Sequence, residues 1–136
     1  MLNLETVLVV VSPNPYSPAE TKYLAIEKNG LLHLPTQIVE CGEVCRLVVD
    51  DLFEKILGFA ASWVQLKQGM LSDNPQRLGC EESLERYVAV PYGCMVPYEC
   101  AASPPNIGRW VTFSELAEYD FYSDHKDILM KMAGAL

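Results

Sequence analysis

The sequence predicts an α+β domain in which a mixed β-sheet lies between helices. Three observations lead to this class: strand-like segments begin the chain, one long amphipathic helix follows them, and further strand-like segments precede short helices at the C-terminal end. The chain has 136 residues, the length of one domain, so we expect a single domain over 1–136. A domain of this size buries a core without metals or disulfides.

Two strands and a tight turn are predicted first. Val7–Val11 is an apolar, mostly β-branched run, and the Ser-Pro-Asn-Pro sequence after it predicts a buried strand that ends in a loop. Lys22–Lys28 predicts a second strand and Leu31–Leu34 a short third strand. Asn29-Gly30 between them is a strong hairpin-turn signal.

The central helix is predicted from about Glu43 to Leu57, with Gly58 as its C-terminal stop. At about 100° per residue, one broad apolar face is formed by Val48, Val49, Leu52, Phe53 and Ile56. The opposite face carries the charged residues Arg46, Asp50 and Glu54, with Asp51 and Lys55 at its edge. We expect these charges to be solvated.

The second half alternates strands and loops. Ala60–Lys67 is predicted as a strand and 69–82 as a polar loop. Arg86–Val96 is again strand-like, although Pro91 and Gly93 favour a bulge, an edge position or two shorter strands.

The C-terminal elements are predicted to be short. Arg109–Val111 is strand-like, and 114–118 is predicted as a helix with Thr112 or Ser114 as its cap. Asp124–Met132 is predicted as an amphipathic terminal helix.

Charge and cysteine content restrict the partners. The net charge of −8 argues against broad electrostatic binding to nucleic acid or to an anionic membrane, but it allows a small phosphorylated ligand in a local pocket. The sequence has no apolar run near twenty residues and no signal-peptide pattern. Its five cysteines are odd in number and form no Cys-x-x-Cys pair, so we expect a cytoplasmic protein with reduced thiols.

The stretch from Leu34 to Phe59 resembles the signature of the Nudix (MutT-like) hydrolases. In that family, Leu-Pro-Gly-Gly and Val-Glu-x-Gly-Glu lead into a helix with Arg-Glu-(apolar)-x-Glu-Glu-x-Gly-(apolar). The spacing fits without a gap, and the matching pairs are Leu34-Pro35, Val39-Glu40, Gly42-Glu43 and Gly58-Phe59. Downstream, Trp110-Val111 and Glu115-Leu116 resemble the family's Trp-Val-x-x-x-Glu-Leu segment. The resemblance implies an αβα sandwich and metal-dependent cleavage of nucleoside diphosphate derivatives.

The family's metal-binding residues are largely replaced in this chain. In the ungapped alignment Asp51 replaces the arginine, Leu52 replaces the first helical glutamate, and Lys55 and Ile56 replace the glutamate pair. Gln37 stands at the position of a glycine. The apolar side chains offer no lone pair to a hard cation such as Mg²⁺.

A one-residue slip gives an alternative carboxylate set. It overlays Asp51 and Glu54 on metal-binding positions, where Glu40 or Glu43 could complete a site for Mg²⁺ or Mn²⁺. The slip rotates the helix by about 100° and abandons the spacing of Glu43 and Gly58. In an active enzyme the catalytic residues would be Glu43, Asp51 and Glu54.

Other candidate residues are weaker. Glu40 is a candidate ligand-binding residue, and Tyr98 is a candidate platform for a stacked base, as aromatics in this family often are. Cys41 and Cys45 with His33 lack the fourth ligand and the spacing of a zinc site. We expect His33 and His125 to be surface or capping residues.

Three functions follow from these observations. The first is a Nudix-fold protein that has lost most pyrophosphohydrolase activity, needs no cofactor, and binds a nucleotide-like ligand or acts as an interaction module. The second is a divergent hydrolase that uses the carboxylate set above with Mg²⁺ or Mn²⁺. The third is a structural partner protein without a small ligand, a homodimer being one such arrangement.

Overall fold

The computed structural model describes residues 2–73 and 86–136. The strands are β1 (Leu2–Ser12), β2 (Lys22–Lys28), β3 (Leu31–His33), β4 (Thr36–Val39), β5 (Lys67–Gln68), β6 (Ser72–Asp73), β7 (Arg86–Met95) and β8 (Arg109–Thr112). The α-helices are α1 (Cys45–Leu57), α2 (Phe113–Glu118) and α3 (His125–Ala135). Short 3-10 turns occur at η1 (Pro18–Glu20), η2 (Ala61–Trp63) and η3 (Tyr98–Ala102).

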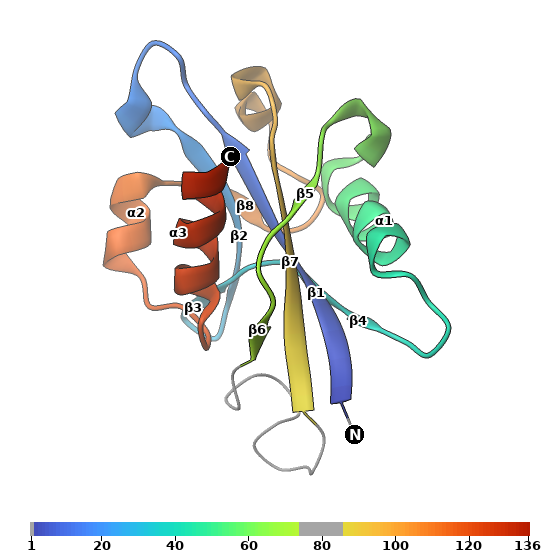
Figure 1. Ribbon diagram of the computed structural model, residues 1–136. Helices are drawn as coiled ribbons and strands as arrows, with labels where there is room; N and C mark the ends of the chain where they lie inside the picture. The colour runs from blue at the N-terminus through green and yellow to red at the C-terminus, as the bar shows by residue number, and fades with distance from the viewer. Residues whose placement is uncertain (1, 74–85) are drawn as a thin grey trace.

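The strands form one mixed sheet between helices, which confirms the predicted α+β class. β1 runs parallel to β7, and the other described pairings are antiparallel. Helix α1 lies on one side of the sheet, and α2 and α3 lie on the other (Figure 1). Each side has its own apolar core, one around Phe53 of α1 and one around Leu129 of α3.

β1 is the central strand. Its residues from Val7 to Val10 are fully buried, as their apolar sequence predicts. One edge of β1 pairs with β7 along its length, from Leu2 opposite Arg86 to Val11 opposite Met95. The other edge is divided, because β4 pairs with residues 4–7 and β2 pairs with residues 11–12.

Helix α1 has the predicted apolar face and the predicted end. All five residues of that face are buried: Val48, Val49, Leu52, Phe53 and Ile56. Gly58 adopts φ 82° at the C-cap, and its N–H donates to the carbonyl of Glu54. Glycine reaches this left-handed conformation without the steric cost of a Cβ, so it ends the helix here.

Helix α2 begins with a capping box in which Thr112, one of the two predicted caps, is the N-cap residue. Thr112 Oγ1 accepts a hydrogen bond from the Glu115 N–H, and the Glu115 carboxylate accepts one from the Thr112 N–H. Arg109 donates to the same carboxylate at 2.9 Å, so β8 and α2 are joined at this point. No helix in residues 2–73 and 86–136 has the length and apolar character needed to cross a bilayer.

The predicted strand over Ala60–Lys67 is wrong. Residues 61–63 form the turn η2, Trp63 is 81% exposed, and only Lys67 of this segment belongs to a strand. Local backbone hydrogen bonds hold this turn: the Trp63 N–H donates to the Ala60 carbonyl, and the Val64 N–H donates to the Ala61 carbonyl. None of the described strands pairs with residues 60–66, so local strand propensity does not decide the conformation. β6 interrupts the predicted polar loop, whose part from 74 onward lies outside the described residues, as does Cys80.

β7 is one continuous strand despite its proline. The Pro91 carbonyl accepts a hydrogen bond from Gly69 on the outer side of β7. The N–H and C=O of one strand residue point to the same side, so the donor that Pro91 lacks would also face outward. The ladder to β1 therefore loses no hydrogen bond at Pro91.

Candidate ligand-binding site

Strand β4 separates two cavities. β4 is not among the strands that the sequence predicts, and its pairing with β1 creates it. Thr36 lies opposite Val7, whose side chain belongs to the core on the α3 side. Side chains alternate along a strand, so Gln37 lies on the α1 side. Thr36 lines one cavity and Gln37 lines the other.

The cavity on the α1 side, here called the helix hollow, has a volume of about 170 Å³. It is lined by Gln37, Glu43, Val48, Asp51, Leu52 and Lys55. Leu52 is 8% exposed and Ile56 is 1% exposed, because both pack into the core around Phe53. These residues do not fit the family's Mg²⁺ or Mn²⁺, since hard cations require several oxygen ligands. In the described part of the chain, no group of three or more His, Cys, Asp or Glu residues is placed to hold a metal ion.

The three candidate catalytic carboxylates do not all meet. Glu43 and Asp51 line the helix hollow, whereas Glu54 is exposed on α1 and does not line it. Glu43 accepts a hydrogen bond from the Glu40 N–H at 2.8 Å, so its carboxylate stabilises the turn before α1. The catalytic roles of these residues stay predictions.

Tyr98 and Glu40 lie in different places. Tyr98, in η3, lines a cavity of about 480 Å³ together with Ser12, Lys22 and Thr112. Its ring meets the ring of the exposed Tyr16 edge to face, with centroids 6.3 Å apart. Glu40 is exposed in the turn after β4. The structure does not bring these two candidate ligand-binding residues together, and their roles also stay predictions.

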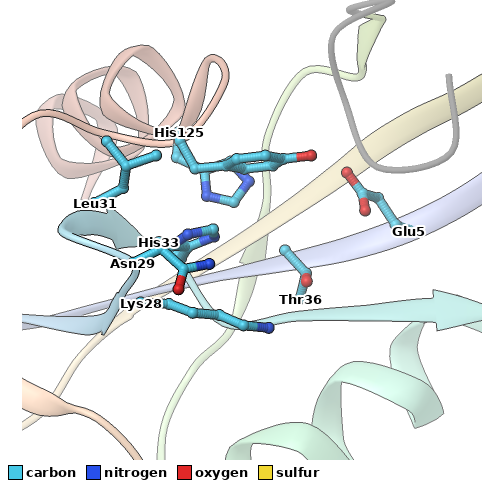
Figure 2. Close-up of a pocket in the computed structure, with 8 residues that line it drawn as sticks. Glu5, Lys28, Asn29, Leu31, His33, Thr36 and His125 are labelled. Atoms are coloured by element: carbon cyan, nitrogen blue, oxygen red, sulfur yellow. The ribbon is translucent and has the colours of Figure 1, made fainter. Parts of the chain in front are cut away.

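The cavity on the α3 side, here called the histidine pocket, has a volume of about 420 Å³. It is lined by Glu5, Lys28, Asn29, Leu31, His33, Thr36, Tyr122 and His125, which come from β1, the β2–β3 hairpin, β4 and the start of α3. It lies beside the point where β2 and β4 share one edge of β1. Figure 2 shows the labelled side chains around this space.

His125 is a buried residue, so the expectation of a surface or capping histidine is wrong for it. It is 1% exposed, and its Nδ1 accepts a hydrogen bond from the Leu34 N–H at 3.0 Å. An Nδ1 that accepts is unprotonated, which assigns the neutral ring to the tautomer with a proton on Nε2. The first residue of α3 is thereby joined to the strand connection that leads into β4.

His33 is half-buried and packs against aromatic rings. It stacks on Tyr122 with centroids 4.7 Å apart and an interplanar angle of 13°, and it meets His125 edge to face at 6.0 Å. Burial lowers the pKa of His33, and the positive charge of Lys28 lowers it further, although a hydrogen bond to the Lys28 backbone opposes this. His33 is therefore held mainly as a neutral ring at neutral pH.

Sequence reasoning missed the histidine pocket. Leu34 and His125 are 91 residues apart, and no local spacing links His33 to Tyr122 or His125. The available signal was a histidine at each of two predicted element ends, which does not indicate that the two ends meet.

Comparison with known proteins gives a fold rather than a close relative. No family model matches the sequence, and no curated protein matches it. Among solved structures, the Nudix domain of Shewanella oneidensis NrtR complexed with ADP ribose is similar, with a TM-score of 0.73 and 15% identity over 99% of this chain and 88% of that one. A mutT/nudix family protein from Listeria innocua has a TM-score of 0.74 and 16% identity over 98% of this chain and 92% of that one.

A third similar structure is NrtR complexed with a 27mer DNA. It has a TM-score of 0.70 and 15% identity over 95% of this chain, which spans only 59% of that chain. Because one similar protein binds DNA, the comparisons do not support our expectation against nucleic-acid binding. The shared architecture over nearly the whole chain, together with the matched Leu34–Phe59 spacing, shows that this chain has the Nudix fold.

Proposed function

We propose that this Nudix-fold domain binds a nucleotide-like ligand in the histidine pocket and has lost most metal-dependent pyrophosphohydrolase activity. The observation that carries the proposal is the burial of Leu52 and Ile56 at two positions where the family has metal-binding glutamates. Divalent cations neutralise the pyrophosphate and activate the attacking water in such reactions. A chain without those glutamates lacks the ligands that would hold the divalent cations for this reaction.

The size and lining of the histidine pocket support ligand binding there. Its volume of about 420 Å³ falls in the range of small-molecule sites, roughly 300–1,000 Å³, as does that of the cavity at Tyr98, about 480 Å³, whereas the helix hollow at about 170 Å³ is smaller. Lys28 supplies a positive charge, and the rings of His33 and Tyr122 supply aromatic surface. The complex of the NrtR Nudix domain with ADP ribose makes ADP-ribose and AMP suitable probes.

A divergent hydrolase is the second candidate, because Glu43 and Asp51 share the helix hollow. This function would require Mg²⁺ or Mn²⁺ and would be lost in a Glu43→Gln variant. A structural role without a small ligand, including homodimer formation, stays a prediction, as does the cytoplasmic location.

Two assays separate these functions. Nucleoside diphosphate derivatives, including ADP-ribose, are incubated with Mg²⁺ or Mn²⁺ and assayed for cleavage of the pyrophosphate bond, which yields AMP and ribose 5-phosphate from ADP-ribose. Binding of the same compounds is measured by calorimetry in EDTA. We expect binding without metal and no chelator-sensitive turnover. Robust turnover that EDTA and Glu43→Gln both abolish would establish the hydrolase instead.

A further inference from the structure

Lys28 carries the positive charge among the residues that line the histidine pocket. The imidazole of His125 already accepts from Leu34, and Glu5 and Tyr122 also have interaction partners. Lys28, by contrast, forms no ion pair within 4.0 Å with any carboxylate in residues 2–73 and 86–136. Among these residues the Lys28 ammonium group has no carboxylate partner, so it can pair with an anionic ligand.

The direction of the side chain matters as much as its charge. Lys28 is the last residue of β2, just before the hairpin turn, and it is exposed. Its side chain nevertheless lines the pocket, and Figure 2 shows it extending past His33 towards Thr36. The effect of its charge on the pKa of His33 is a second sign that the ammonium group acts within the pocket.

Three other basic side chains of this acidic domain form ion pairs within the chain. Lys131 pairs with Asp127 at 3.0 Å, Arg46 with Asp50 at 3.0 Å and Arg109 with Glu115 at 2.9 Å. Lys22 and Lys55 also line cavities without such a partner among the described residues, but Lys28 brings its positive charge to the cavity that also holds the rings of His33 and Tyr122. It is suited to a ligand that brings its own negative charge.

We propose that Lys28 recognises the phosphate group of the ligand, so that the histidine pocket selects phosphorylated nucleotide-like compounds over their neutral counterparts without a metal ion. The inference rests on the proposed function, because it names the residue that binds the phosphate group of the proposed ligand. The phosphate lies at the Lys28 side of the pocket, near the Thr36 hydroxyl. The ring system of the ligand lies towards His33 and Tyr122.

The test compares two ligands that differ only in the phosphate. Binding of AMP and of adenosine is measured by calorimetry in EDTA for the wild type and for Lys28→Met, which keeps the length and apolar stem of the side chain. We expect the wild type to prefer AMP, and Lys28→Met to weaken AMP binding about tenfold, as expected for a charge-assisted hydrogen bond, with little effect on adenosine. Lys28→Arg should retain the preference.

A matched control is Lys126→Met. Lys126 is exposed on α3, next to His125, and does not line the pocket, so its loss removes the same charge without removing the contact. Equal effects of Lys28→Met on AMP and adenosine, or no effect on either, would overturn the inference while leaving the proposed function standing. If the wild type binds neither AMP, adenosine nor ADP-ribose, both proposals fail.

Discussion

The Nδ1 of His125 accepts a hydrogen bond from the backbone N–H of Leu34 across 3.0 Å, with His125 1% exposed. This contact connects the start of α3 to the residue that precedes Pro35 and β4. Both histidine-pocket walls, the hairpin side with His33 and the helix side with Tyr122, meet at this point. The geometry of the pocket therefore depends on a neutral imidazole.

Replacing His125 with Phe should destabilise the domain. Phenylalanine fills a similar space but offers no acceptor, so the buried Leu34 N–H is left without its partner. The expected loss in the free energy of unfolding is about 1–3 kcal/mol, measured by urea denaturation. Lys126→Ala, one residue along on the exposed side of α3, should change stability little. An unchanged midpoint for His125→Phe would show that the contact contributes nothing.

His33 should make stability depend on pH. Its pKa is lowered by burial and by Lys28, so the unfolded chain, with an ordinary pKa of about 6.5, binds more protons than the folded chain in mildly acidic solution. This contribution to stability is present above about pH 6.5 and is lost as pH falls through the lowered pKa. Unfolding measured from pH 5 to pH 8 should show a smaller acid loss in His33→Asn than in the wild type. Parallel profiles would contradict the shift.

Gly108 should tolerate a methyl group poorly. Its φ is +84°, and a Cβ there would lie 2.6 Å from the backbone oxygen of Ala25. Gly108→Ala therefore combines a strained backbone with a clash against backbone that cannot move aside, and we expect a loss of about 2–4 kcal/mol.

Gly30 is the matched control for Gly108. Its φ is +77°, but a Cβ there would meet no atom within 4 Å. Gly30→Ala should therefore lose only the conformational part, about 1–2 kcal/mol. Equal losses in the two variants would show that the contact with Ala25 has no effect.

A single substitution should give the helix hollow a metal response. Lys55 lines it together with Glu43 and Asp51, so Lys55→Glu would place three carboxylates in the same hollow. We expect millimolar Mg²⁺ or Mn²⁺ to raise the melting temperature of this variant but not that of the wild type, because a cation that binds only the folded state stabilises it. Lys126→Glu, at an exposed position outside the hollow, serves as the charge control. A wild type stabilised by Mg²⁺ to the same degree would favour the divergent hydrolase.

Local sequence patterns were sufficient for the elements whose conformation depends on neighbours in the chain. The apolar period of α1 correctly predicted that Leu52 and Ile56 are buried, and Gly58 predicted the end of the helix. Val7–Val11 predicted a buried strand, now seen as part of β1, and the spacing of Leu34–Phe59 predicted the fold that the structural comparisons support. Helical periodicity and capping act within a few residues, so one sequence displays them.

Long-range contacts decided the rest. β4 exists because it pairs with β1, and the predicted strand over 60–67 is reduced to Lys67 because none of the described strands pairs with residues 60–66. The histidine pocket needs segments about ninety residues apart to meet, and His125 is buried because α3 docks its first turn against Leu34. Strand pairing and helix docking depend on which surfaces the folded chain brings together. The local spacing of residues along the sequence does not indicate which distant segments will meet.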